Sequence, residues 1–197
     1  MSALKIKKGA TSHSAYNLRP TFSDVEEKHT LAVLVDNEAG VLARVIGLFS
    51  GRGYNIDSLS VGTTEDPNTS RMTVVVAGDE RVLEQIIKQL YKLVNTVKVT
   101  EHAPGAAIER EIMLVRINAD SKRRGEILDA AGIFEARAVD VGKTTITFEL
   151  SGDPGRLNDF LELMRPYGIV DLVKSGRIAL ARDPKSNNGR RPELRTA

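Results

Sequence analysis

The 197-residue chain contains no cysteine and no tryptophan, and aromatic residues make up only 5% of it. The lack of cysteine excludes disulfides, thiolate metal sites and thiol catalysis within the chain, and it fits a reducing compartment. No apolar run approaches the roughly 20 residues that a membrane-spanning helix requires. We therefore expect a cytoplasmic protein that does not bind a membrane.

An excess of charge of either sign is also missing, because the net charge is only +2. Residues 1–28 carry five Lys or Arg against three acids, and residues 183–197 carry four against two. Basic polar tails are usually solvated and mobile, whereas a nucleic-acid footprint lies on a folded face. We expect two flexible tails and no nucleic-acid binding. The first 23 residues lack acids, which leaves import into a plastid or mitochondrion open.

Residues suited to catalysis or metal binding are sparse and scattered. Gly51–Gly53 lacks the last glycine of a dinucleotide fingerprint, and adjacent acids lie in a tail or in turns, where they are expected to be solvated. The basic run Lys122–Arg124 could bind phosphate, although a solvated helix start is commoner. The histidines, which lack metal-ligand spacing and are expected to be solvated, are His13, His29 and His102. We predict no catalytic residue, metal or cofactor in this chain.

Hydrophobic periodicity in the first half predicts a β-α-β-β-α-β order. The predicted strands are 31–35, 55–64, 71–77 and 96–100. The first of them is an unbroken apolar run, as expected for a strand covered on both faces. An amphipathic helix from Val41 is ended by Gly51 and Gly53, and Asp79 is the expected N-cap of the second helix. This order is that of the ferredoxin-like unit, with both helices on one face of an antiparallel sheet.

The same order recurs in the second half of the chain. The predicted strands there are 112–117, 136–141, 144–150, 170–173 and 178–180, the last two of which close the sheet. Helices are predicted over 122–134 and from Asp153-Pro154 onward. The fold class is therefore α+β, with two tandem ferredoxin-like βαββαβ domains. The predicted boundaries are a tail 1–28, a first domain 29–103, a linker 104–110, a second domain 111–182 and a tail 183–197. Uncovered faces and edges of the sheets favour a homodimer.

The most informative motif lies between the first strand and the first helix. Gly40 stands at the mouth of the helix, where backbone amides without intrahelical partners could hold a carboxylate. Asn37 and Asn55 add side-chain donors and acceptors for a small polar molecule. The remaining residues of this candidate site are Ala39, Val41, Leu42 and Ile56. Periodicity alone supports a simple strand-to-helix turn equally well.

These residues carry a resemblance to a known family. The segments that carry it are Asn37–Leu42, Arg44–Phe49, Arg52–Ile56, Ser70–Thr73, Glu109–Leu114 and Lys174–Gly176. They resemble an ACT domain and, more closely, the regulatory small subunits of acetolactate synthase (acetohydroxyacid synthase). The resemblance covers about residues 30–181, and the tails fall outside it.

The resemblance implies a partner that does the chemistry. In this family a catalytic subunit carries thiamine diphosphate, Mg²⁺ and FAD and condenses pyruvate with pyruvate or 2-oxobutyrate, the first common step to the branched-chain amino acids. The small subunit raises that activity and confers feedback inhibition by valine, with leucine and isoleucine as further candidates. Its ACT domains pair side by side, with effector sites at the pair interface. The resemblance assigns Asn37, Gly40 and Asn55 to valine.

Three further readings of the sequence stay open. Arg71, which begins an otherwise apolar strand, is a candidate contact for the catalytic subunit, or else an edge charge that prevents strand addition. An RNA-binding module uses the same βαββαβ order but needs aromatic residues on its central strands. The third reading is a stand-alone amino-acid-sensing ACT protein that regulates another enzyme or transporter.

Overall fold

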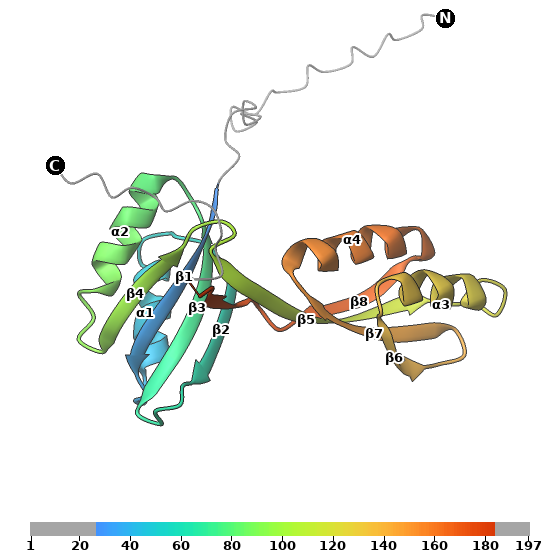
Figure 1. The fold of residues 1–197 in the computed structure, drawn as a ribbon, viewed down its shortest axis with the longest axis horizontal. Helices are drawn as coiled ribbons and strands as arrows, with labels where there is room; N and C mark the ends of the chain where they lie inside the picture. The colour runs from blue at the N-terminus through green and yellow to red at the C-terminus, as the bar shows by residue number, and fades with distance from the viewer. Residues whose placement is uncertain (1–26, 184–197) are drawn as a thin grey trace, which may run out of the picture.

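A computed structural model describes residues 27–183, which form two antiparallel sheets and four α-helices (Figure 1). This α+β architecture confirms the predicted fold class. The first half contains β1 (Lys28–Asp36), α1 (Val41–Ser50), β2 (Ile56–Thr63), β3 (Thr69–Ala77), α2 (Glu80–Leu90) and β4 (Thr96–His102). Its sheet has the strand order β2-β3-β1-β4, so that β2 and β4 are the edges.

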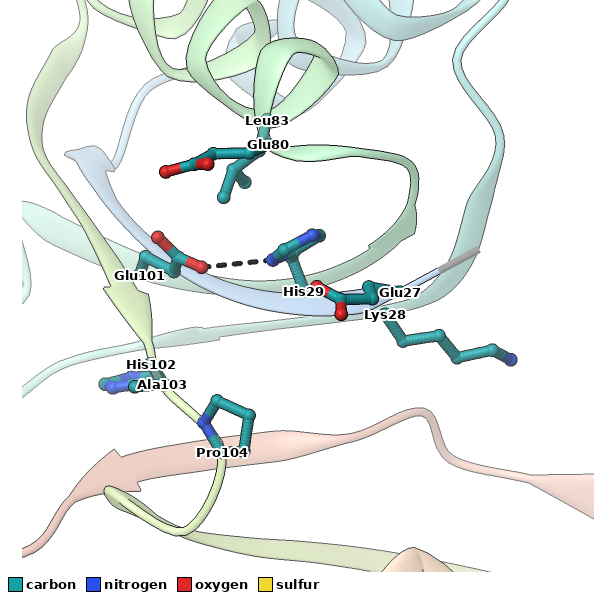
Figure 2. Close-up of a pocket in the computed structure, with 9 residues that line it drawn as sticks. All are labelled: Glu27, Lys28, His29, Glu80, Leu83, Glu101, His102, Ala103 and Pro104. Carbon is teal, nitrogen blue, oxygen red and sulfur yellow. Dashed lines mark hydrogen bonds and ion pairs between the residues drawn. The ribbon is translucent and has the colours of Figure 1, made fainter. Parts of the chain in front are cut away.

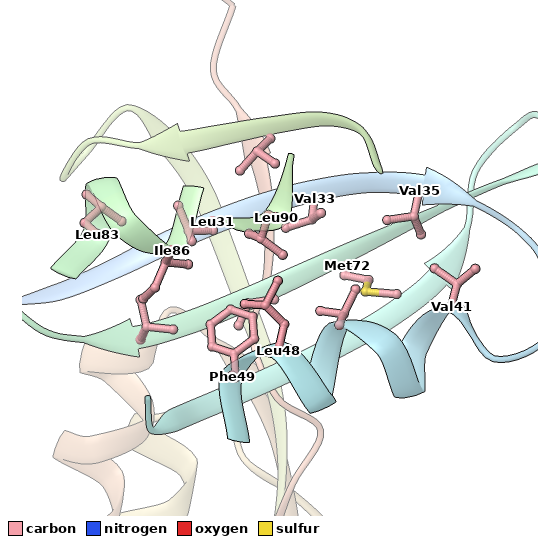
Figure 3. Close-up of a cluster of buried hydrophobic side chains, with 14 residues drawn as sticks. Leu31, Val33, Val35, Val41, Leu48, Phe49, Met72, Leu83, Ile86 and Leu90 are labelled. Atoms are coloured by element: carbon pink, nitrogen blue, oxygen red, sulfur yellow. The ribbon is translucent and has the colours of Figure 1, made fainter. Parts of the chain in front are cut away.

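One face of the first sheet packs against α1 and α2 (Figure 3). Leu31, Val33 and Val35 of β1 point into this core and are at most 1% exposed. The alternate residues Ala32 and Leu34 lie on the opposite face and are only half-buried. The expectation that β1 is covered on both faces is therefore wrong, because the helices shield one side of the sheet only.

The helix ends follow the local signals in the sequence. The α1 helix stops at Ser50 before Gly51, as expected. The carboxylate of Asp79 accepts a 2.8 Å hydrogen bond from the amide of Val82 and caps α2. Such a cap satisfies an amide that has no partner within the helix.

The second half repeats the pattern with its own core. It contains β5 (Ala107–Asn118), α3 (Arg124–Ile133), β6 (Arg137–Val141), β7 (Thr145–Gly152), α4 (Pro154–Met164), the 3₁₀ turn η1 (Arg165–Tyr167), β8 (Ile169–Lys174) and β9 (Ile178–Ala181). The strand order β6-β7-β5-β8 places α3 and α4 over one face. Phe148 and Phe160 meet edge to face in the core, with ring centroids 6.1 Å apart. The predicted hairpin and the helix that opens at Pro154 are both present.

Two expectations for the second half need correction. The linker predicted over 104–110 ends at Ala106, because residues 107–110 are already the start of β5. The last strand, β9, does not lie beside β8; it pairs with residues 107–110 of β5 and lies next to the first sheet (Figure 1). Periodicity could not reveal this pairing, because the two partners are about 70 residues apart in the chain.

The two sheets are joined at a polar contact, here called the junction, made by Thr30, Ser58, Glu109, Gly176 and Arg177. Thr30 donates a 2.8 Å hydrogen bond to one oxygen of Glu109, and the guanidinium of Arg177 donates to the other at 3.2 Å. The backbone amide of Arg177 donates to Ser58 of β2 at 2.7 Å. The junction therefore ties β1 and β2 of the first sheet to the beginning of β5 and the turn before β9.

The predicted tails fall almost entirely outside the described residues. Lys28, counted as tail, is the first residue of β1, and its ammonium lies 2.7 Å from Asp57. None of the helices within residues 27–183 is long and apolar enough to cross a membrane.

Candidate functional site

The loop between β1 and α1 places Gly40 at the helix mouth in a left-handed conformation, with φ 85° and ψ −5°. No side chain caps α1. A Cβ built at Gly40 meets no atom within 4 Å, so the space in front of the helix is open. Helix amides without partners attract anions, and the helix dipole adds to the attraction. The end of α1 therefore offers an exposed, uncapped site for a carboxylate.

Asn37 is held beside this helix mouth by the turn between β2 and β3. Its side-chain nitrogen donates to the carbonyl of Pro67 at 2.8 Å, and its oxygen accepts from Ser70 at 3.0 Å. An amide side chain has two N–H groups and two acceptor lone pairs, so one of each is left for a ligand. The cluster of turn-forming residues at 65–69 predicts the turn itself. Local sequence patterns did not predict that this turn holds Asn37.

Asp66 organises that turn. Its carboxylate accepts hydrogen bonds from the backbone amide of Asn68 at 2.9 Å and from the Thr69 hydroxyl at 3.2 Å. The bond from the Asn68 amide, the largest cause, holds the pKa of the Asp66 carboxyl below its usual value. A turn fixed in this way can position Asn37 accurately.

A network of charged groups surrounds the same loop, centred on Asn95, which is only 8% exposed. Asn95 donates to Glu38 at 3.0 Å and to Asp36 at 3.4 Å, and it accepts from Arg44 of α1. Carboxylates therefore lie close to helix amides that favour an anion. A site with both features suits the paired charges of an α-amino acid.

Asn55 lies at the other end of the sheet. The strand registers pair Ile56 with Val76 and Val76 with His29, whereas Asn37 follows Asp36 at the far end of β1. His29 and Asp36 are seven residue steps apart on β1, about 23 Å at a rise of roughly 3.3 Å per residue. The side chain of Asn55 donates to Asp57 at 2.7 Å. A single chain therefore does not bring Asn37 and Gly40 together with Asn55.

The apolar residues of the candidate site divide in the same way. The side chain of Val41 is buried in the core, with 3% exposure, so only the backbone of Val41 can contribute to a site at the helix mouth. Leu42 is 39% exposed on the outer side of α1 and can contact a ligand or a second protein. Ile56 packs in part against the core beside Asn55, at the far end.

A cavity of about 560 Å³ lies elsewhere, beside the start of α2 and the end of β4 (Figure 2). His29 points into it, and its ring lies 3.0 Å from Glu101 and 3.2 Å from the carbonyl of Gly78. The expectation of a solvated histidine is wrong here, because the His29 side chain is only 13% exposed. Within residues 27–183, no group of three or more histidines, cysteines or acids is placed to hold a metal ion.

The basic run 122–124 serves the fold. The guanidinium of Arg124 donates to three backbone carbonyls, those of Ala119, Gly142 and Lys143, at 2.7–3.2 Å. Arg123 stacks over the ring of Tyr167 at 4.6 Å. These two cations are already engaged, which disfavours the phosphate-binding reading of the run.

Arg71 lies on β3, which is paired with β1 on one side and with β2 on the other. It therefore cannot guard an edge of the sheet, and that reading of Arg71 is wrong. Arg71 lies on the face of the sheet away from the helices, and the residue paired with it on β1 is Leu34.

Comparison with known proteins matches both halves of the chain. Residues 31–98 match the model of the acetohydroxyacid synthase small subunit-like ACT domain, and residues 110–183 match that of the small subunit of acetolactate synthase. A protein of Archaeoglobus fulgidus named as a probable acetolactate synthase small subunit is 51% identical over 158 residues, which cover 80% of this chain and 99% of that protein.

Two further relatives agree. The small subunit of acetolactate synthase isozyme 3 from Escherichia coli is 48% identical over 80% of this chain and 98% of its own length. The crystal structure of an acetolactate synthase small subunit from Thermotoga maritima superposes with a TM-score of 0.72 at 35% identity, over 79% of this chain and 98% of that one.

Proposed function

The chain belongs to the family of acetolactate synthase small subunits, and on this premise we propose that it activates a catalytic subunit and confers feedback inhibition by valine. Thiamine diphosphate, Mg²⁺ and FAD belong to that catalytic subunit, and this chain contributes regulation to branched-chain amino acid synthesis in the cytoplasm. The observation that carries the proposal is the open, uncapped N-terminus of α1 at Gly40.

A homodimer supplies the part of the site that one chain lacks. The edge strand β2 is free for pairing within the described residues. Exposed apolar side chains lie near this edge: Leu42 and Ile46 of α1 and, on the helix side of the sheet, Val61. Burying such residues against a second copy removes apolar surface from water and satisfies the backbone groups of the edge.

Antiparallel pairing of β2 with β2 of a second copy reverses the ends of the strand. Ile56 of the second copy then lies near Thr63, whose partner on β3 is Ser70. Because Ser70 is hydrogen-bonded to Asn37, this arrangement brings Asn55 of the second copy to the helix mouth of the first. The separation within one chain thus becomes an argument for a site shared by two.

Each part of valine has a matching group in such a shared site. The carboxylate fits the uncapped amides around Gly40, and the ammonium fits the acids Asp36 and Glu38 or an amide oxygen of the asparagines. Leu42 and Ile56 of the second copy offer apolar contacts for the isopropyl group. Inhibition then requires that valine bind the inhibited arrangement more tightly, and typical coupling energies are about 1–3 kcal/mol.

Reconstitution with the cognate catalytic subunit tests the proposal. We expect the wild-type chain to raise acetolactate synthesis and valine to reverse the increase. Gly40→Asp places a carboxylate where that of valine should bind, so calorimetry should detect no valine binding. Gly105→Asp is the matched control, since Gly105 also has a positive φ, 77°, and open space around its Cβ position. Unchanged valine affinity in Gly40→Asp would refute the assigned site.

The rival readings predict other results. A stand-alone sensor would not activate the catalytic subunit, and the match of residues 110–183 to the small-subunit model weighs against it. An RNA-binding sheet would carry aromatic residues on β1 and β3, whereas Ala32, Leu34 and Thr73 occupy the face away from the helices. Filter binding with RNA should give no retention.

A further inference from the structure

Two cations stand in one row on the face of the first sheet that the helices leave free. Leu34 of β1 is paired with Arg71 on β3 and with Lys98 on β4. The side chains of directly paired residues point to the same face of a sheet. Arg71 and Lys98 therefore flank Leu34 from both sides, and both are exposed.

The side chain of neither cation makes a hydrogen bond or an ion pair with another residue of the described chain, in contrast to those of Arg124 and Arg177. Two like charges in one row repel each other, and here no acid separates them, since their shared neighbour is Leu34. An anion placed between them would remove this repulsion and gain two charge-assisted hydrogen bonds.

A small hollow of about 260 Å³ lies at this row, with Leu34 and Leu180 among its apolar lining residues and Arg71, Lys98 and His102 among its polar ones. The Nε2 atom of His102 is buried without a hydrogen-bond partner in the described chain. A buried nitrogen without a partner loses its hydration and gains nothing in return. The hollow thus combines two cations that have no partner among residues 27–183 with the His102 ring and apolar lining residues, which suits a carboxylate on a short aliphatic arm.

We propose that the Arg71–Lys98 row receives an acidic side chain of the catalytic subunit. The inference rests on the proposed function, which supplies that partner. The hollow is smaller than the roughly 300–1,000 Å³ typical of small-molecule sites. Around it the surface stays apolar and open, because Leu180 is 59% and Ile178 57% exposed on the adjacent β9. An acidic residue with apolar neighbours on a protein surface fits this pattern of charge and exposure.

The row also remains accessible in the proposed dimer. Pairing through the edge strand β2 does not cover the row itself, and β4, which carries Lys98, is the opposite edge. A catalytic subunit can therefore contact the row on the face away from the helices while valine occupies the helix mouth, which follows the end of β1 on the helix side.

The test is a charge reversal at both positions. Arg71→Glu with Lys98→Glu should weaken binding to the catalytic subunit by about tenfold or more, measured by titrating activation and by direct binding, and should flatten the salt dependence of that binding. Lys92→Glu is the control, because Lys92 is also exposed but follows α2 on the helix side. If the reversed variant loses its dimer or its heat stability, Arg71→Leu with Lys98→Leu takes its place and should show the same flattened salt dependence.

The outcomes separate this inference from the function on which it rests. The wild-type chain and the double variant could both activate the catalytic subunit with the same affinity and salt dependence. This result would refute docking at the Arg71–Lys98 row and leave the regulatory function standing. If the wild-type chain fails to activate at all, the proposed function falls first. Calorimetric binding of acetate or pyruvate to the isolated chain, lost in Arg71→Leu, would show a small-molecule site instead and overturn the assignment to the partner. Valine affinity should be the same in all variants.

Discussion

The hydroxyl oxygen of Ser58 accepts a 2.7 Å hydrogen bond from the backbone amide of Arg177, a residue 119 positions further along the chain. The chain reaches this contact through Gly176, which has φ 83° and whose Cβ position would lie 2.7 Å from the carbonyl oxygen of Leu59. Only a residue without a side chain permits this approach. The sheet that carries the candidate effector site is thereby fixed to the second half of the molecule.

Gly176→Ala should therefore lower the free energy of unfolding by more than the cost of placing alanine in a left-handed conformation. Gly105→Ala is the reference, because Gly105 has a similar φ of 77° and no atom within 4 Å of its Cβ position. We expect about 1–2 kcal/mol for the left-handed conformation in both variants, and about 1–3 kcal/mol more for the contact in Gly176→Ala. Urea denaturation measures the difference. Equal losses would show that the junction tolerates a side chain at Gly176.

Mixed dimers test whether two copies share each valine site. Gly40→Asp and Asn55→Ala chains should each bind valine poorly on their own. In a mixed dimer one site receives both substitutions and the other receives neither, so about a quarter of the wild-type sites should return after random mixing of equal amounts. Calorimetry counts them. No recovered binding, with mixed dimers verified by mass spectrometry, would refute a site shared by two copies.

The protonation of His102 should depend on Arg71. Burial, the largest cause, lowers the pKa of His102 below its ordinary 6.5; Glu109 opposes this shift and Arg71 adds to it. Arg71→Leu should therefore raise the His102 pKa, which nuclear magnetic resonance titration of the ring proton reports. Lys98→Leu, at a position that is not among these causes, is the comparison. A His102 pKa that is unchanged or lower in Arg71→Leu would contradict the proximity of the two groups.

The same shift predicts a direction for stability. Because folding lowers the pKa of His102, the unfolded chain binds more protons just below pH 6.5. The stability contributed by neutral His102 is fully present above its unfolded pKa and is lost as the pH falls toward the folded one. The fall in Tm on acidification should accordingly be smaller in His102→Gln than in the wild type.

Asn95→Ala should loosen the loop that carries Gly40. Asn95 is the common hydrogen-bond partner of Asp36, Glu38 and Arg44. The substitution removes these three hydrogen bonds from the charged groups. We expect a loss of about 1–3 kcal/mol in unfolding free energy and weaker valine binding. Asn158→Ala, which removes one 3.4 Å contact on the surface, should cost far less. A loss no larger than that of the control would show that the network is dispensable.

Much of the fold followed from local patterns in the sequence. The amphipathic stripe from Val41, the cap at Asp79 and the hairpin turn at Gly142 are set by residues close together in the chain, and all three are present. The pairing of β9 with β5 depends on two distant segments, so periodicity could place Ile178–Leu180 in a strand but could not choose its partner.

The candidate site shows the same limit. The sequence identified Gly40 because its effect is local, at the first turn of one helix. It could not reveal that Asn55 lies at the opposite end of the sheet, since that separation follows from the registers of β1, β2 and β3. Nor could it show that Asn95 joins the loop, because a single asparagine in a turn carries no recognisable pattern.

The continuous strand β5 has a consequence for how such a protein can evolve. Its residues 107–110 pair with β9 beside the first sheet, and its later residues form the centre of the second sheet. A gene fragment that ended between β4 and β5 would lack residues 107–110 and β9, both of which lie beside the first sheet. An exchange of either half by recombination would therefore separate the first sheet from the strands that lie beside it.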